Sequence, residues 1–250
     1  MLSDFLCLIR GGGDLGTGVA LQLKRIGMPV VVCDLKNPLA VRRKVSLSSA
    51  ILDKKIEIEE ITGERVDDLS TINDLSSTQV VPVIISDSLP TFPISVLVDA
   101  RMQKKSMDTK IDDASLVIAL GPGFFAGRDC HVVIETMRGP NMGKVIWDGC
   151  AEEDTGIPGE VGGLTSERLL RSPSNGEISW VKQIGDLVEK DEGSHHAAAD
   201  GGQGATNFEP AEIAGARHDN GVNRVAGGRV SGDRFRSVNP AHRLSSNKYL

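Results

Sequence analysis

Residues 5–24 read FLCLIRGGGDLGTGVALQLK, a short apolar run that breaks into G-x-G-x-x-G at residues 11–16 and continues in a helical pattern. A second apolar run, residues 29–32, follows Gly27 and leads to Asp34. Strand, tight glycine turn, helix and second strand thus arrive in the order of a βαβ unit. The stretch predicts an α/β protein with a Rossmann-like, doubly wound, mainly parallel sheet.

The glycine turn also predicts a binding site. Gly11 and Gly13 let the backbone turn sharply and approach a pyrophosphate, and Gly16 lets the helix pack closely on the strand. The helix, which Asp14 opens, offers free N–H groups and a partial positive charge to an anion. Asp34 lies 18 residues past Gly16, where an acid accepts hydrogen bonds from a ribose 2′-OH. These five residues are candidate cofactor contacts.

Two alternatives stay open at this turn. Many doubly wound domains keep such glycines for packing alone and bind nothing there. If a dinucleotide binds, Asp34 favours an NAD-like ligand because it would repel a 2′-phosphate, although Arg42 and Arg43 follow closely enough to weaken that preference.

Later apolar runs extend the predicted sheet. Continuous runs at 80–85, 96–100, 116–120 and 131–135 are typical of strands buried on both faces. Alternation with a period of two over 55–61 predicts a half-exposed strand. The gap between residues 100 and 116 leaves room for a short helix. We assign residues 1–150 to a nucleotide-binding domain.

A second glycine loop follows the run at 116–120. Backbone N–H groups in such a loop can form an anion-binding nest, and Arg101 and Arg128 could add bidentate phosphate contacts. Both glycine loops should lie at the carboxyl ends of parallel strands, where doubly wound folds bind ligands. The alternative is a structural turn, with Arg101 paired to Asp99. The candidate cofactor contacts here are Gly121, Gly123, Gly127 and Arg101.

The composition changes along the C-terminal part of the chain. Residues 151–192 carry short apolar runs and Pro/Gly turns that predict a partial, barrel-sandwich-like β-module. Residues 193–250 hold one lysine and six arginines, whereas residues 1–192 hold eleven lysines and ten arginines. This change in the ratio of lysine to arginine suggests a reading-frame change near Glu192. That segment is expected to be irregular or disordered. An irregular segment there would supply no strands to cover apolar positions such as Trp180 and Val188, and such an exposed apolar edge favours association into a homo-oligomer.

Charge and hydropathy exclude several classes of partner. The net charge of −6 and pI near 5.4 give no basic field for nucleic acid. No apolar run approaches the roughly 18 residues of a membrane helix, so a cytoplasmic protein with no membrane partner is expected.

Adjacent Cys130 and His131 would point to opposite faces of a strand and could not bind one metal ion together, so we predict no metal site.

Six separated blocks of the sequence carry a family resemblance: residues 11–18, 98–102, 121–124, 126–127, 133–136 and 155–159. Together they resemble the accessory proteins of selenium-dependent molybdenum hydroxylases, relatives of the xanthine dehydrogenase accessory factors with a Rossmann-like domain. The resemblance covers roughly residues 5–191 and implies a role in maturing a molybdenum hydroxylase client, through handling its cofactor or labile selenium. It transfers no catalytic residues.

Three functions therefore compete. The first is a maturation factor that binds an NAD-like dinucleotide or a molybdopterin dinucleotide and serves the client enzyme. The second is a free-standing NAD-dependent oxidoreductase, although the chain lacks a Tyr-x-x-x-Lys pair and its only tyrosine is Tyr249. The third is a non-catalytic interaction scaffold with empty glycine turns. The catalytic residues, if any, are not identified by the sequence.

Overall fold

The structure, a computed structural model, divides into two compact units, Met1–Asp154 and Thr155–Leu250. Residues 5–40, 42–72, 74, 78–103, 108–157, 160 and 163 are described. Beyond them the structure describes the backbone of short strands between residues 176 and 236.

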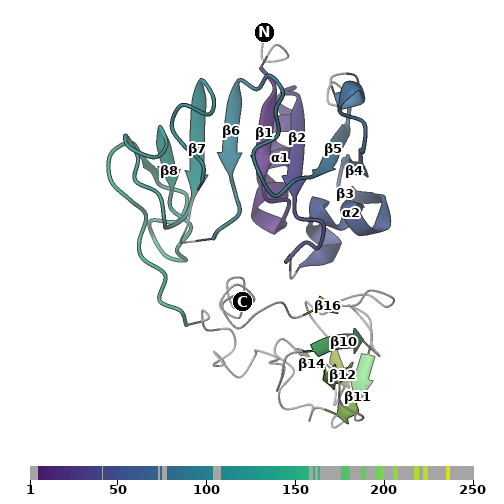
Figure 1. Cartoon of the computed structure of the whole chain (residues 1–250). Helices are drawn as coiled ribbons and strands as arrows, with labels where there is room; N and C mark the ends of the chain where they lie inside the picture. The colour runs from purple at the N-terminus through teal and green to yellow at the C-terminus, as the bar shows by residue number, and fades with distance from the viewer. Residues whose placement is uncertain are drawn as a thin grey trace. The chain divides into compact units, whose positions relative to one another are not determined.

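The first unit is built on a nine-stranded sheet in the order β3-β4-β5-β2-β1-β6-β7-β8-β9 (Figure 1). The strands from β4 to β8 in this order are parallel. Without β4, the parallel strands follow the doubly wound order 3-2-1-4-5-6. The sequence prediction of a Rossmann-like α/β fold is therefore confirmed. These parallel strands are β1 Cys7–Arg10, β2 Val30–Asp34, β5 Val80–Ile85, β6 Val96–Asp99, β7 Leu116–Leu120 and β8 Val132–Ile134.

Antiparallel strands close both edges of this sheet. β3 (Lys55–Ile58) and β4 (Ile61–Arg65) form a hairpin at one edge, and β9 (Val145–Ile146) pairs with β8 at the other. The single strand expected over 55–61 is wrong, because the chain turns at Glu59, whose φ is 50°. The alternation of apolar and polar residues breaks there, at adjacent Glu59 and Glu60.

Helices are few in the described part of the first unit. α1 (Asp14–Arg25) connects β1 to β2, and only short turns follow: η2 (Arg43–Val45), η3 (Leu47–Ser49), α2 (Ala50–Asp53) and η4 (Leu69–Thr71). The short helix expected between residues 100 and 116 does not occur in the described residues of that connection. Among described helices, none is long and apolar enough to cross a membrane.

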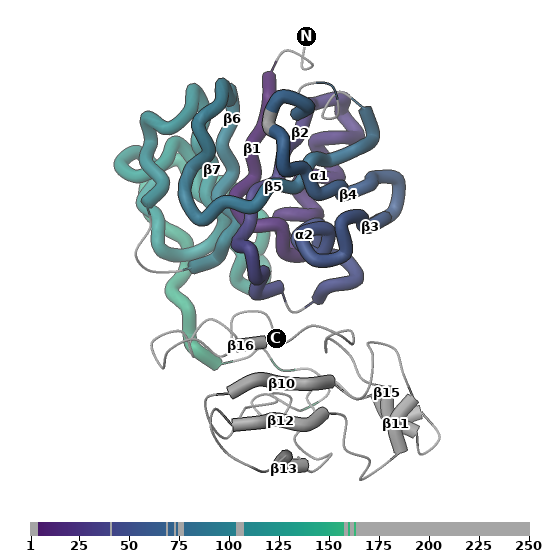
Figure 2. Tube along the Cα trace, turned by 45° about the vertical axis from the view of Figure 1, so that its right-hand side comes forward, coloured from purple at the N-terminus to yellow at the C-terminus, as the bar shows by residue number. Residues whose placement is uncertain are grey.

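The core fills both faces of the sheet because side chains alternate along each strand. α1 contacts β1 and β2, and Figure 2 shows it beside them. The opposite face carries a cluster of buried apolar residues with no contribution from α1: Leu8, Val31, Cys33, Leu97, Val117 and Phe124 are among its members. Each fully buried side chain of this size contributes about 1.5–3 kcal/mol. Two buried faces thus fix the carboxyl ends of β1, β2 and β6.

The second unit contains two small antiparallel sheets, β13-β12-β10-β16 and β11-β15-β14. Strands from the predicted β-module pair with strands beyond Gly193, as β10 does with β12. Some of these strands fall within residues 193–250, for which we expected an irregular tail. The rest of that segment lies outside the described residues, as do the side chains of Trp180 and Val188, so the expectation stays a prediction. The strands are β10 Gly176–Trp180, β11 Leu187–Glu189, β12 His195–Ala199, β13 Ala205–Asn207, β14 Arg217–Asp219, β15 Val222–Arg224 and β16 Phe235–Arg236.

Candidate functional site

Gly11 and Gly16 are required by packing. Gly11 follows β1 with φ of 97°, and a Cβ on it would lie 2.9 Å from the Arg101 backbone nitrogen. A Cβ on Gly16 would lie only 2.0 Å from the Gly11 carbonyl oxygen. These two glycines let α1, β1 and the end of β6 meet closely, as predicted for Gly16. Their identity alone therefore does not indicate a ligand.

Gly13 differs from both. Its φ is −64°, a value that any residue adopts, and a Cβ placed on it meets no atom within 4 Å. Gly13 is the N-cap of α1, which has no side-chain cap. The first backbone N–H groups of a helix lack intrahelical partners and carry a partial positive charge. Packing therefore does not require a glycine at this position.

Asp34 lies at the end of β2 and faces the glycine loop. Its Oδ2 accepts a hydrogen bond from the Gly12 N–H at 2.8 Å, and its Oδ1 accepts one from the Leu35 N–H at 2.7 Å. Burial raises the pKa of Asp34, and these hydrogen bonds and the Arg101 charge oppose the rise. A carboxylate has about four acceptor positions. Asp34 thus braces the loop and keeps positions for a further donor such as a ribose hydroxyl.

A short segment after β2 supports the other side of the loop. The Ser48 N–H donates to the Gly12 carbonyl at 2.9 Å, and the Leu47 N–H donates to Thr17 Oγ1 at 2.9 Å. Asp14, at the start of α1, forms an ion pair with Arg42. Asp14 is therefore already engaged within the chain, and Arg42 brings a positive charge beside the helix N-terminus.

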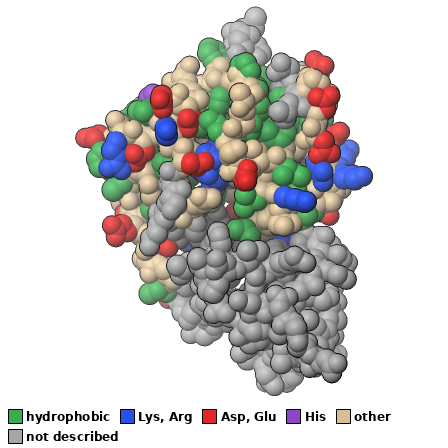
Figure 3. Space-filling view, in the orientation of Figure 1, with side chains coloured by type: hydrophobic (Ala, Val, Ile, Leu, Met, Phe, Trp, Pro, Cys, Tyr) green, Lys and Arg blue, Asp and Glu red, His purple; other side chains and the backbone are tan. Residues whose placement is uncertain are grey.

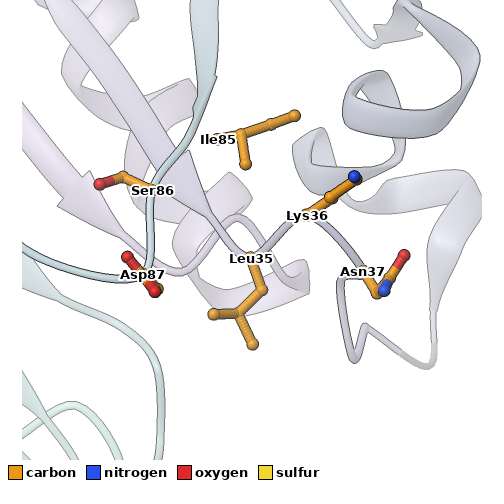
Figure 4. Close-up of a pocket in the computed structure, with 6 residues that line it drawn as sticks. All are labelled: Leu35, Lys36, Asn37, Ile85, Ser86 and Asp87. Carbon is orange, nitrogen blue, oxygen red and sulfur yellow. The ribbon is translucent and has the colours of Figure 1, made fainter.

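A hollow of about 470 Å³ begins at Leu35, the residue that follows Asp34 in the chain (Figure 4). It is open to solvent at the carboxyl ends of β2 and β5. Leu35 and Ile85 give it apolar surface, and polar side chains surround them. Sequence reasoning missed this hollow, although both residues directly follow or end predicted strands. Its lining residues are Leu35, Lys36, Asn37, Ile85, Ser86 and Asp87.

The second glycine loop does not lie at one edge of the sheet. Gly121 follows β7 at the carboxyl edge, and its N–H donates to the Ile134 carbonyl at 2.8 Å. The Gly127 N–H donates to the Cys130 carbonyl, also at 2.8 Å, just before β8 begins at Val132. Gly127 is therefore at the amino end of β8, which differs from the expectation for the whole loop. Gly123 is exposed, with φ of 109°.

The two arginines expected to help this loop are paired within the protein. Arg128 is exposed, forms an ion pair with Asp129 and lies over the Phe125 ring. Arg101 Nη2 lies 2.6 Å from Asp99 Oδ2 and 2.7 Å from Asp108 Oδ1. The structure thus contains the Arg101–Asp99 pair that the sequence left as an alternative. Ligand contacts by Arg101, Gly121, Gly123 and Gly127 stay predictions.

Arg10 is a buried cation that the sequence analysis did not single out. It ends β1, is 2% exposed, and donates to Asp108 and Thr109. Its partner Asp108 follows 98 residues later, so no local pattern reveals the pair.

Buried polar residues elsewhere serve the fold. Glu135, which is buried, accepts hydrogen bonds from the backbone N–H groups of Thr136, Met137 and Glu152. The described residues contain no group of three metal-ligating side chains. On the visible face of the first unit, acidic and basic side chains are interspersed (Figure 3).

Comparison with known proteins gives one informative relative. No protein-family model matches the chain. The chain is 38% identical over 189 residues to the uncharacterized protein YqeB of Escherichia coli (strain K12). The match takes in 74% of this chain and 35% of that protein, so the chain spans about a third of the length of the curated relative. This similarity indicates homology to YqeB, and it carries no activity with it.

Proposed function

We propose that the first unit binds a dinucleotide-type cofactor across the carboxyl edge of its sheet. The observation that carries the proposal is Gly13, which has open space before it at an uncapped helix N-terminus. It lies where the strand order reverses between β1 and β6, the place where doubly wound sheets bind ligands. A pyrophosphate there would accept hydrogen bonds from the first N–H groups of α1.

The rest of an adenosine moiety has a place beside this phosphate position. Asp34, one step along the edge, offers carboxylate oxygens to ribose hydroxyls. The hollow beyond it offers Leu35 and Ile85 to the faces of a base, with polar side chains for its edges. Phosphate, sugar and base subsites thus follow one another over neighbouring strand ends. This arrangement supports an NAD-like ligand or the nucleotide half of a molybdopterin dinucleotide.

We further propose that the chain uses this ligand as an accessory factor in maturing a selenium-dependent molybdenum hydroxylase. The support is the resemblance of the sequence blocks together with the state of nearby polar groups. Asp99, Arg101 and Glu135 are engaged in internal hydrogen bonds. Binding and transfer of a cofactor requires no acid–base residue, whereas hydride transfer between substrates usually does.

Calorimetric titration of the full chain with NAD and with molybdopterin dinucleotide tests the binding proposal. Gly13→Val should lower the affinity at least about tenfold, because its methyl groups would enter the phosphate position. Gly18→Val is the matched control, since Gly18 is exposed on the same helix and a Cβ on it also meets no atom within 4 Å. The absence of binding to either dinucleotide would contradict the proposal.

The accessory role needs its own experiment. A selenium-dependent molybdenum hydroxylase produced with the wild-type chain should contain more of its cofactor than the same enzyme produced with Gly13→Val. Equal cofactor content would reject the role while leaving dinucleotide binding intact. NAD reduction by the purified chain, dependent on Asp34, would instead favour the oxidoreductase. Client capture unaffected by Gly13→Val would favour the scaffold.

A further inference from the structure

Arg10 places a cation inside the protein at the carboxyl end of β1. Its side chain shares the sheet face of Leu8, opposite the face that α1 covers, because side chains alternate along the strand. Arg10 Nη1 donates to Asp108 Oδ1 at 3.0 Å and to Thr109 Oγ1 at 2.7 Å, and Nη2 donates to Asp108 Oδ2 at 2.9 Å. A buried arginine requires such a partner, since an unpaired buried charge is strongly destabilising.

The carboxylate of Asp108 is shared by two arginines. Arg101 Nη2 lies 2.7 Å from Asp108 Oδ1, on the oxygen that also meets Arg10 Nη1. The arginine side chains are 2% and 14% exposed, whereas that of Asp108 is 53% exposed. Partial burial raises the pKa of Asp108, but the hydrogen bonds from both guanidinium groups hold it well below its usual range. Two inward cations thus converge on one anion at the solvent boundary.

The inner part of the cluster is satisfied without Asp108. Asp99, which is fully buried, accepts hydrogen bonds from Arg101 Nε and Nη2 and from Thr109 Oγ1. Arg101 therefore has its own carboxylate. Arg10 has Asp108 as its anionic partner among the described residues. Asp108 supplies the outermost charge, and removing it would leave an excess of one positive charge in the cluster.

We propose that Arg10 and Arg101 form a binding site for a phosphate group, which the Asp108 carboxylate fills in this structure. The forked N–H donors of arginine match phosphate oxygens as they match a carboxylate. The exposed position of Asp108 is also the position that a phosphate group from solvent would reach. The site lies at the ends of β1 and β6, on the sheet face opposite α1. It uses Arg101, which is also a candidate cofactor contact, but its guanidinium donors are distinct from the N–H groups of α1 on which the dinucleotide proposal depends.

Inorganic phosphate is the probe, with affinity for the full chain measured by calorimetry at constant ionic strength. Asp108→Asn keeps the side-chain shape and removes the competing charge, so phosphate should bind at least about tenfold more tightly than to the wild type. Asp108→Glu, which keeps the carboxylate, should stay near the wild-type affinity. Asp129→Asn, which removes the partner of exposed Arg128, should also leave it unchanged.

Thermal unfolding adds a second measurement. Phosphate, but not chloride, should raise the unfolding temperature of Asp108→Asn more than that of the wild type, because phosphate replaces the lost anion. The gain in phosphate affinity should persist in Gly13→Val/Asp108→Asn, since the α1 terminus is a separate site. Loss of the gain in that double variant would place the phosphate at α1 and overturn the proposal. No gain in Asp108→Asn, or failure to fold even with phosphate present, would make Asp108 a structural ion-pair partner only.

Discussion

Replacing Gly16 by alanine tests how closely α1 packs on the loop after β1. The new Cβ would lie 2.0 Å from the Gly11 carbonyl oxygen and 3.3 Å from Ala100 Cβ. Carbon atoms approach oxygen comfortably only beyond about 3 Å, so the helix must retreat by roughly an ångström. Overpacking of this kind costs typically 1–3 kcal/mol, and up to about 1 kcal/mol is regained from helix propensity. We expect a net loss of about 2 kcal/mol in the free energy of unfolding.

Urea and thermal unfolding followed by circular dichroism measure this loss. For a unit of this size, about 2 kcal/mol corresponds to a fall of roughly 4–8 °C in Tm. Gly18→Ala makes the same chemical change two residues later, where a Cβ meets nothing within 4 Å. It should raise stability by up to about 1 kcal/mol. Equal stability of the two variants would refute the close packing of α1 on Gly11.

Three further predictions follow from buried charges and thiols. Asp99→Ala should lower the free energy of unfolding, measured in urea, by about 3 kcal/mol or more, because Arg101 would then be buried without its main partner. A loss below about 1 kcal/mol would contradict a stabilising role of the buried Asp99–Arg101 pair. NAD affinity should fall as the pH drops through the pKa of Asp34, because the protonated acid is a poorer hydrogen-bond acceptor; burial raises this pKa above 3.8. The Asp34→Asn variant should lack this pH dependence. If the variant kept the pH dependence, Asp34 would be excluded as its cause. In the native protein a thiol reagent should modify only Cys150 quickly, since Cys150 is exposed and the other three cysteines are buried. In urea all four cysteines should react. Rapid modification of several thiols in the native protein would contradict that burial.

The main features of the fold could be predicted because they depend on local patterns. Continuous apolar runs marked β5, β6 and β7, since strands buried on both faces need no alternation. The glycine turn marked α1 because backbone geometry there admits few residues. The turn at Glu59 was missed although the alternation of apolar and polar residues breaks there, at adjacent Glu59 and Glu60, and the φ of 50° at Glu59 reveals the hairpin.

The candidate site could be predicted only in part, because much of it depends on distant contacts. Asp34 was found from its spacing, but its bond to the Gly12 N–H required the fold. Arg10 ends the first apolar run of the sequence. Its pairing with Asp108 was missed because nothing nearby in the sequence shows that Asp108 will reach it. Gly127 was placed at the wrong end of a strand because the length of the loop does not show where the chain turns back.

The central claim is that α1 and its glycine turn receive a phosphate-bearing cofactor. Backbone amide chemical shifts of the isotope-labelled full chain, recorded while NAD is added, test it most directly. The account predicts that the amides of Gly13, Asp14 and Leu15 shift most, together with those of Leu35 and Ile85, while the amide of Gly127 stays unchanged. Shifts confined to the loop at 121–128, or no shifts at saturating NAD, would contradict it.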